Sequence, residues 1–127
     1  MAELSRLADL MIRLTPPRTE DDFATLAQAN EDFHRTIYVA SGSPRLKVVM
    51  AAIVDVGVVA RTYRSYRARD LARSARHHRE IADAIAARAP DWADHVMTAH
   101  VLAAMAALEA TFDQGSKGSA SPRRGAA

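Results

Sequence analysis

The sequence contains no cysteine, and this absence excludes disulfide bonds and thiolate zinc sites. Any metal would have to bind to imidazole, carboxylate or amide groups. No apolar run approaches the roughly 18 residues that a membrane-spanning helix requires, so we expect no contact with a membrane. The amino-terminal segment carries acidic residues early and lacks a basic start followed by an apolar core, which argues against a secretory signal. We therefore expect a cytoplasmic protein.

The chain also lacks a strong charge of either sign, because its net charge is only +2. Three of its 17 basic residues lie in the carboxyl-terminal stretch GSKGSASPRRGAA, which has no acid, so 14 basic residues remain against 15 acidic ones. A nearly neutral body gives no support to direct nucleic-acid binding. We expect residues 114–127, which are rich in Gly and Ser, to form a disordered tail.

What the sequence does have is a helical pattern of apolar residues, over a length that suits one domain. The predicted helices span residues 3–14, 20–41, 46–67, 70–89 and 92–112. Thr19, Ser43 and Asp91 are the expected N-caps, and Gly42 is expected to end the second helix. These features predict an all-α antiparallel helical bundle over residues 1–113.

The third predicted helix is unusually apolar. It contains the run KVVMAAIVDVGVVA, whose valines and isoleucine would also suit a β-strand. The length of the run, the cap at Ser43 and the absence of any partner strand favour a helix instead. Because this helix is apolar around most of its circumference, we expect it to lie centrally in the bundle.

Three of the five histidines lie within apolar stripes on three different predicted helices. On the second helix, Asn30 and His34 are one turn apart and both point inward. His78 and His100 hold inward positions on the fourth and fifth helices.

A single buried histidine is usually a core residue that bonds to a carbonyl group. Three at once need partners for both nitrogens of each ring, and one core has few free acceptors. A shared divalent ion would satisfy all three, whereas three unrelated core histidines are the alternative. His77 and His95 fall off these stripes and are expected at the surface.

Two stretches of the sequence carry a family pattern. NEDFHRTIYVASGSPRL resembles D/N-x-x-F-H-x-x-[ILV]…A-S-G-N-x-x-L, and HHREIADAIAARAPDWADHVMTAHV resembles H-x-x-I-x-x-A-I…D-x-x-x-A-x-x-x-M-x-x-H-[LV]. These patterns are typical of the FCD domain, the effector-binding domain of GntR-type (FadR-like) bacterial transcription regulators. The similarity covers roughly residues 3–108 in the correct order.

The resemblance implies a helical bundle that encloses a pocket. Many family members hold a divalent metal there with one Asp or Asn and three His, and the metal helps to bind a small carboxylate effector. Carried over to this chain, the metal ligands are Asn30, His34, His78 and His100, the same four positions that periodicity turns inward. Asn30 stands where Asp is frequent, so one negative charge is missing, although an amide oxygen can still coordinate. Zinc, nickel or manganese are the expected ions.

The sequence departs from the family at its amino end. The family domain normally begins with an earlier helix that contributes an arginine to the pocket, and its regulators carry a winged helix-turn-helix before it. This sequence contains neither, so we expect no direct DNA binding by the chain. Arg61 or Arg64 could replace the missing arginine, and Gly57 on the same line could leave room for a ligand. The alternative is that these arginines form a solvated basic end.

The expected function is therefore that of an effector-sensing domain of a GntR-like regulator, which forms a homodimer and binds a metal and a small carboxylate. It is not expected to be an enzyme. A metal-dependent enzyme is one alternative, because three histidines also describe a catalytic zinc site, but no Asp or Glu lies on the inward stripes to act as a base. A structural dimerisation module with a vestigial pocket is the other.

Overall fold

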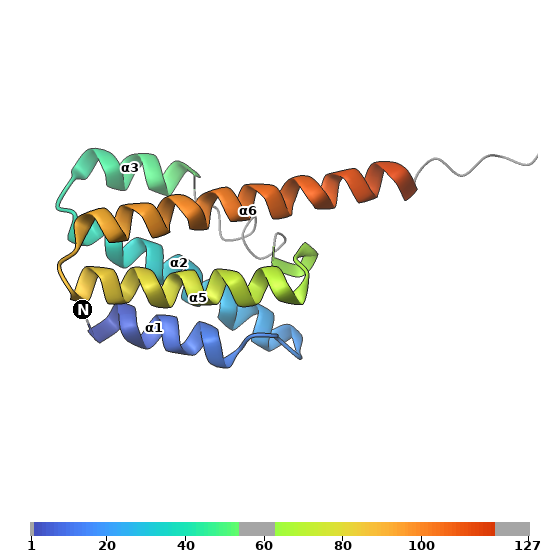
Figure 1. The fold of residues 1–127 in the computed structure, drawn as a ribbon, viewed down its shortest axis with the longest axis horizontal. Coiled ribbons are helices and arrows are strands. Elements are labelled where there is room, and N and C mark those ends of the chain that lie inside the picture. Colours follow the sequence, from blue (N-terminus) through green and yellow to red (C-terminus); the bar gives the residue numbers. More distant parts are fainter. Residues whose placement is uncertain (1, 54–62, 119–127) are drawn as a thin grey trace, which may run out of the picture.

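The computed structural model describes residues 2–53 and 63–118, and every regular element in these ranges is a helix (Figure 1). The helices are α1 (Ala2–Arg13), α2 (Glu20–Ala40), α3 (Pro44–Ile53), α5 (Ala68–Ala86) and α6 (Pro90–Gly118). No strand occurs among the described residues. The predicted all-α class is confirmed.

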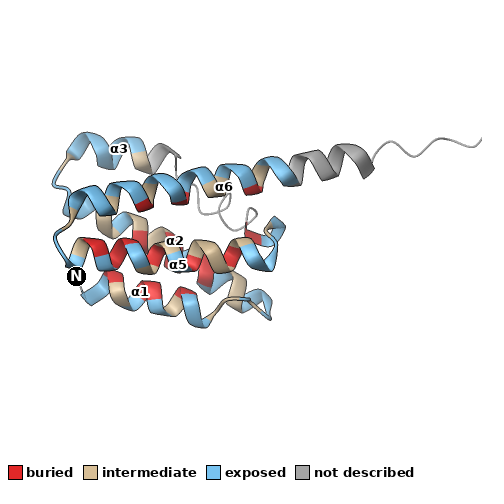
Figure 2. Ribbon diagram, viewed as in Figure 1, coloured by how far each residue is buried: buried red, intermediate tan, exposed pale blue. Residues whose placement is uncertain are grey.

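The helices pack as a bundle in which α5 lies between α1 and α6 (Figure 1). α2 packs against α1, and α3 packs mainly against α2. Buried residues concentrate on α1, α2 and α5, whereas α3 and most of α6 are exposed (Figure 2). The largest fully buried side chains are Phe33, Leu7, Met11, Ile81 and His78. A histidine is thus among the innermost residues of the bundle.

The helix ends follow from local hydrogen bonding. The backbone N–H of Asp22 donates to Thr19 Oγ1 at 3.1 Å, and the Thr19 N–H donates to Asp22 Oδ2 at 3.1 Å. This reciprocal capping box satisfies two donors at the start of α2. Gly42 has a φ of +65°, which suits glycine just after α2, and Ser43 Oγ accepts from the Leu46 N–H at 3.2 Å at the start of α3. These contacts confirm the predicted caps at Thr19 and Ser43 and the predicted end of α2 at Gly42. The predicted cap at Asp91 is wrong, because α6 begins at Pro90 and Asp91 lies in its first turn.

The predicted central position of the third helix is wrong for α3. The side chains of Leu46, Val48 and Val49 are 40%, 70% and 52% exposed. The apolar composition of a helix shows that it can be buried, but it does not show which other elements would bury it. In this chain α1, α2 and α5 form most of the core. Residues 54–62, with Gly57 and Arg61, lie outside the described residues.

The last helix is longer than its sequence predicts. α6 continues to Gly118, so residues 114–118, which were expected to belong to a disordered tail, are helical. Adding residues to an existing helix is much easier than starting one, and this favours continuation through Gln and Lys. Residues 119–127 are not among the described residues. No helix in the described part of the chain is long and apolar enough to cross a membrane.

Polar contacts fix the position of α5 beside the histidine-bearing region. Arg79, the residue after His78, donates to Asp9 at 3.2 Å and to Ser5 at 3.4 Å, both on α1. It also pairs with Asp83 on its own helix. Because only 27% of the Arg79 side chain is exposed, this contact helps to hold α5 against α1.

Candidate metal centre

Three histidines from three helices meet inside the bundle. His34 of α2, His78 of α5 and His100 of α6 each offer a ring nitrogen, and these nitrogens all lie within 4.8 Å of one another. The Nε2 atoms of His34 and His78 are 3.2 Å apart, and the ring centroids of His78 and His100 are 4.4 Å apart. The sequence pattern turned each of these positions inward, and the fold brings all three together.

The hydrogen bonding of His78 defines its tautomer. Its Nδ1 lies 2.8 Å from the carbonyl oxygen of Ser74, one turn earlier on α5. Because a carbonyl can only accept, Nδ1 carries the hydrogen and donates. In the neutral ring, Nε2 then carries the lone pair, which faces His34. A backbone bond of this kind orients an imidazole for metal binding through its other nitrogen.

Burial keeps the three rings neutral. Burial lowers the pKa of His34 from 6.5 to about 4 and that of His100 to about 3. The pKa of His78 is lowered well below its ordinary value, first by complete burial and then by the neighbouring His100 and His34. At neutral pH each ring is therefore in the form that binds a metal.

The donor set suits a divalent ion such as zinc. Two nitrogens bound tetrahedrally to zinc at about 2.1 Å would be about 3.4 Å apart, close to the 3.2 Å between His34 and His78. His100 Nδ1 is buried without a hydrogen-bond partner among the described residues, as expected for a group whose partner is an ion. Phe33 packs edge-on against His78, with centroids 4.9 Å apart, and walls the site with an apolar ring.

Asn30, the fourth predicted ligand, is buried one turn before His34 on α2. Its Oδ1 accepts a hydrogen bond of 2.7 Å from the hydroxyl of Tyr63. Burial raises the pKa of Tyr63, so this hydroxyl stays protonated and donates. A carbonyl oxygen has two lone pairs, so the Tyr63 bond leaves one of them on Asn30. Sequence reasoning found Asn30 but missed its partner.

The predicted ligand-binding arginines do not join this cluster within the described residues. Arg64 forms an ion pair with Glu20, the first residue of α2, at 2.6 Å, and both side chains are exposed. Arg61 and Gly57 lie outside the described residues. Arg64, in the helical residues 63–65 that precede α5, therefore contacts the start of α2 at the surface.

His77 was missed by the sequence pattern, which places it at the surface. It is only partly exposed, its Nδ1 is buried without a partner among the described residues, and its ring centroid is 5.9 Å from that of His100. The signal was the His-His pair, because the residue next to an inward position lies at the edge of the same face. His95 is exposed, as expected.

Comparison with known families gives a match over most of the chain. Residues 1–114 match the family described as FCD domain, which is most of the chain. Comparison with curated proteins and with solved structures gives no significant match.

Proposed function

The chain belongs to the FCD domain family, and from this premise we propose that it is the effector-sensing domain of a GntR-like transcription regulator. FCD domains are the effector-binding parts of transcription regulators. The observation that supports a metal-dependent version of this role is the buried cluster of His34, His78 and His100. Buried polar groups without partners are rare, so the unpartnered Nδ1 of His100, beside the neutral rings of His34 and His78, favours a bound ion.

The proposed metal ligands are the three histidines together with Asn30 through Oδ1. Zinc, nickel and manganese are the proposed ions, because imidazole suits zinc and nickel, and a carbonyl oxygen such as that of Asn30 suits manganese. Since all four ligands are neutral, an ion held there would keep its double positive charge and attract an anion. This favours a small carboxylate as the effector.

The residues that would hold the rest of the effector stay predictions. Arg64 would have to leave Glu20 to reach a ligand, which is feasible because exposed ion pairs contribute little stability. Arg61 and Gly57 remain candidates from the sequence alone.

We propose binding rather than catalysis. Metal-dependent hydrolysis usually needs a carboxylate base beside the metal. Within the described residues, the cluster of metal-ligating groups consists of histidines only. Turnover of a substrate that disappears in a His78→Ala variant would support the enzyme alternative instead.

We further propose that the chain forms a homodimer, by analogy with dimeric transcription regulators that bind paired DNA sites. Several large apolar side chains of α3 and α6 are exposed in the single chain, and they include Val48 at 70% and Leu102 at 59%. Such side chains favour an interface with a second copy. The cytoplasmic location stays a prediction.

Thermal unfolding with and without zinc tests the metal proposal. An ion that binds only the folded state at about 100-fold above its Kd should stabilise the chain by about 2.7 kcal/mol. We expect zinc to raise the Tm of the chain, and His78→Ala to abolish this rise. His95→Ala is the matched control, because His95 is exposed and outside the cluster. Equal zinc responses in both variants would reject the site.

A second arm tests the effector. The zinc-loaded chain is titrated with a panel of small carboxylates, and we expect at least one to raise the Tm further. The same compound should have no such effect on the His78→Ala variant. If zinc stabilises the chain but no carboxylate adds to it, the metal proposal stands and the effector class is wrong.

A further inference from the structure

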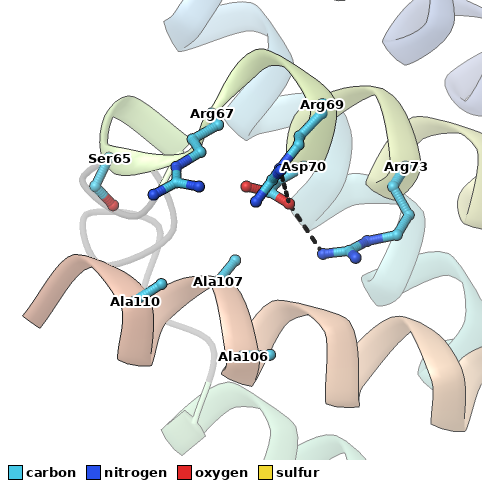
Figure 3. Close-up of a pocket in the computed structure, with 8 residues that line it drawn as sticks. All are labelled: Ser65, Arg67, Arg69, Asp70, Arg73, Ala106, Ala107 and Ala110. Carbon is cyan, nitrogen blue, oxygen red and sulfur yellow. Dashed lines mark hydrogen bonds and ion pairs between the residues drawn. The ribbon is translucent and has the colours of Figure 1, made fainter. Parts of the chain in front are cut away.

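A pocket of about 200 Å³ lies between the start of α5 and the second half of α6 (Figure 3), and no histidine lines it. Three arginines of one short stretch line it, namely Arg67, Arg69 and Arg73. On the opposite side, α6 presents alanines, including Ala107 and Ala110, whose small side chains leave the space open (Figure 3). The volume is several times the roughly 30 Å³ that one water molecule occupies in the liquid.

The pocket has an excess of positive charge. Asp70 is its single lining carboxylate among the described residues, and it already pairs with Arg73 at 3.1 Å and lies 3.9 Å from Arg69. Arg67 has no carboxylate partner in the described part of the chain. Three guanidinium groups against one carboxylate leave two positive charges around one hollow. One guanidinium group can donate two charge-assisted hydrogen bonds, one to each of two oxygens of a carboxylate or phosphate.

This pocket is separate from the histidine cluster. A second, narrower cavity shares Asp70 and Arg73 with it and reaches His77 and His100, but its volume is only about 10 Å³. That space is at the lower limit for one water molecule, so a molecule with several heavy atoms cannot pass through it. A ligand in the arginine pocket would not touch the three histidines.

We propose that the arginine pocket is a second ligand site, which binds a small oxyanion, a carboxylate or a phosphate, without a metal. The bound anion lies between α5 and α6, which carry His78 and His100. It neutralises the excess charge of Arg67 and Arg69, and it stabilises the packing of the two helices at this end. The site does not depend on the proposed metal centre.

Calorimetric titration of the metal-free chain with inorganic phosphate, and separately with succinate, tests this site at low ionic strength. We expect one of the two to bind, and the tighter one identifies the chemistry. Arg67→Gln/Arg69→Gln should weaken that binding by about tenfold or more, because each substitution removes a charge-assisted hydrogen bond to the anion. Both side chains are exposed, so the variant should fold.

The matched control is Arg13→Gln/Arg45→Gln, which removes the same charge at exposed positions outside the pocket. We expect it to keep the affinity of the unaltered chain. No binding of either anion to the metal-free chain would overturn the proposal, and so would equal losses in the two double variants. Binding that appears only after zinc is added, and that survives Arg67→Gln/Arg69→Gln, would place the anion at the histidines and also overturn it.

Discussion

At the residue scale, the histidines of the cluster tie stability to pH. Their folded-state pKa values are lowered, to about 4 for His34 and about 3 for His100, whereas an unfolded chain has values near 6.5. Between these values the unfolded state binds protons that the folded state does not, so stability must rise with pH in this window. The contribution is complete above pH 6.5 and is lost as the pH falls.

We therefore expect the free energy of unfolding of the metal-free chain to fall between pH 6.5 and 5. The slope is at most about 1.4 kcal/mol per pH unit for each histidine of the cluster. Chemical denaturation at several pH values measures it. His34→Leu should reduce the slope, whereas His95→Gln, which alters an exposed histidine outside the cluster, should leave it unchanged. A flat profile would contradict the burial of neutral rings.

Tyr63 is the second residue whose role can be measured. Tyr63→Phe removes the donor to Asn30 and leaves a buried carbonyl oxygen without its partner, at a cost of about 1–3 kcal/mol. Tyr66→Phe is the matched control, because the Tyr66 hydroxyl is less buried and makes a longer bond, 3.3 Å to the Ala104 carbonyl. Urea denaturation should show the larger loss for Tyr63→Phe. Equal losses would show that the Asn30 bond contributes no more than an ordinary one.

At the element scale, both ends of α2 and the start of α3 were predictable because their determinants are local. Thr19 and Asp22 are three residues apart, and Gly42 follows α2 directly, so the caps can be read without knowledge of the fold. The place of α3 was not predictable. Its apolar residues show that it can be covered, but which helices cover the core depends on contacts between distant segments.

The capping box gives the corresponding prediction. Thr19→Ala removes the acceptor of the Asp22 N–H, and we expect a loss of about 0.5–2 kcal/mol in the free energy of unfolding. Thr25→Ala makes the same chemical change at an exposed position inside α2 and serves as the control. Threonine is a poorer helix former than alanine, so this control should be neutral or slightly stabilising. Equal effects from the two variants would mean that the cap does not hold α2.

At the scale of the whole molecule, the histidine cluster was more predictable from the sequence than the arginine pocket or the contact between Tyr63 and Asn30. Inward positions on three stripes located His34, His78 and His100, because spacing along a helix fixes the face on which a residue lies. The spacing of residues along a helix could not locate the arginine pocket, because that pocket depends on how the start of α5 lies against α6. Nor could it find Tyr63 beside Asn30, since these residues are 33 positions apart in the chain.

The proposed homodimer makes a prediction at the same scale. Leu102 is 59% exposed on α6, and Leu102→Asp would place a charge in an apolar interface, so the variant should shift towards a monomer. Light scattering after size-exclusion chromatography measures the mass. Thr25→Asp adds the same charge at an exposed position on α2 and should keep the mass of the unaltered chain. A chain that is monomeric without any substitution would contradict the proposal.

The shallow burial of α6 has a consequence for how the chain opens. Among the α6 residues with described side chains, only Val96, His100 and Ala107 are buried, which is fewer than on α1, α2 or α5. Segments of this kind detach in partial opening before the rest of a protein unfolds. An ion bound by His100 together with His34 of α2 and His78 of α5 would couple the local opening of α6 to the global unfolding of the chain. Ion binding would then change the cooperativity of unfolding, and α6 would be the helix whose local opening responds to it.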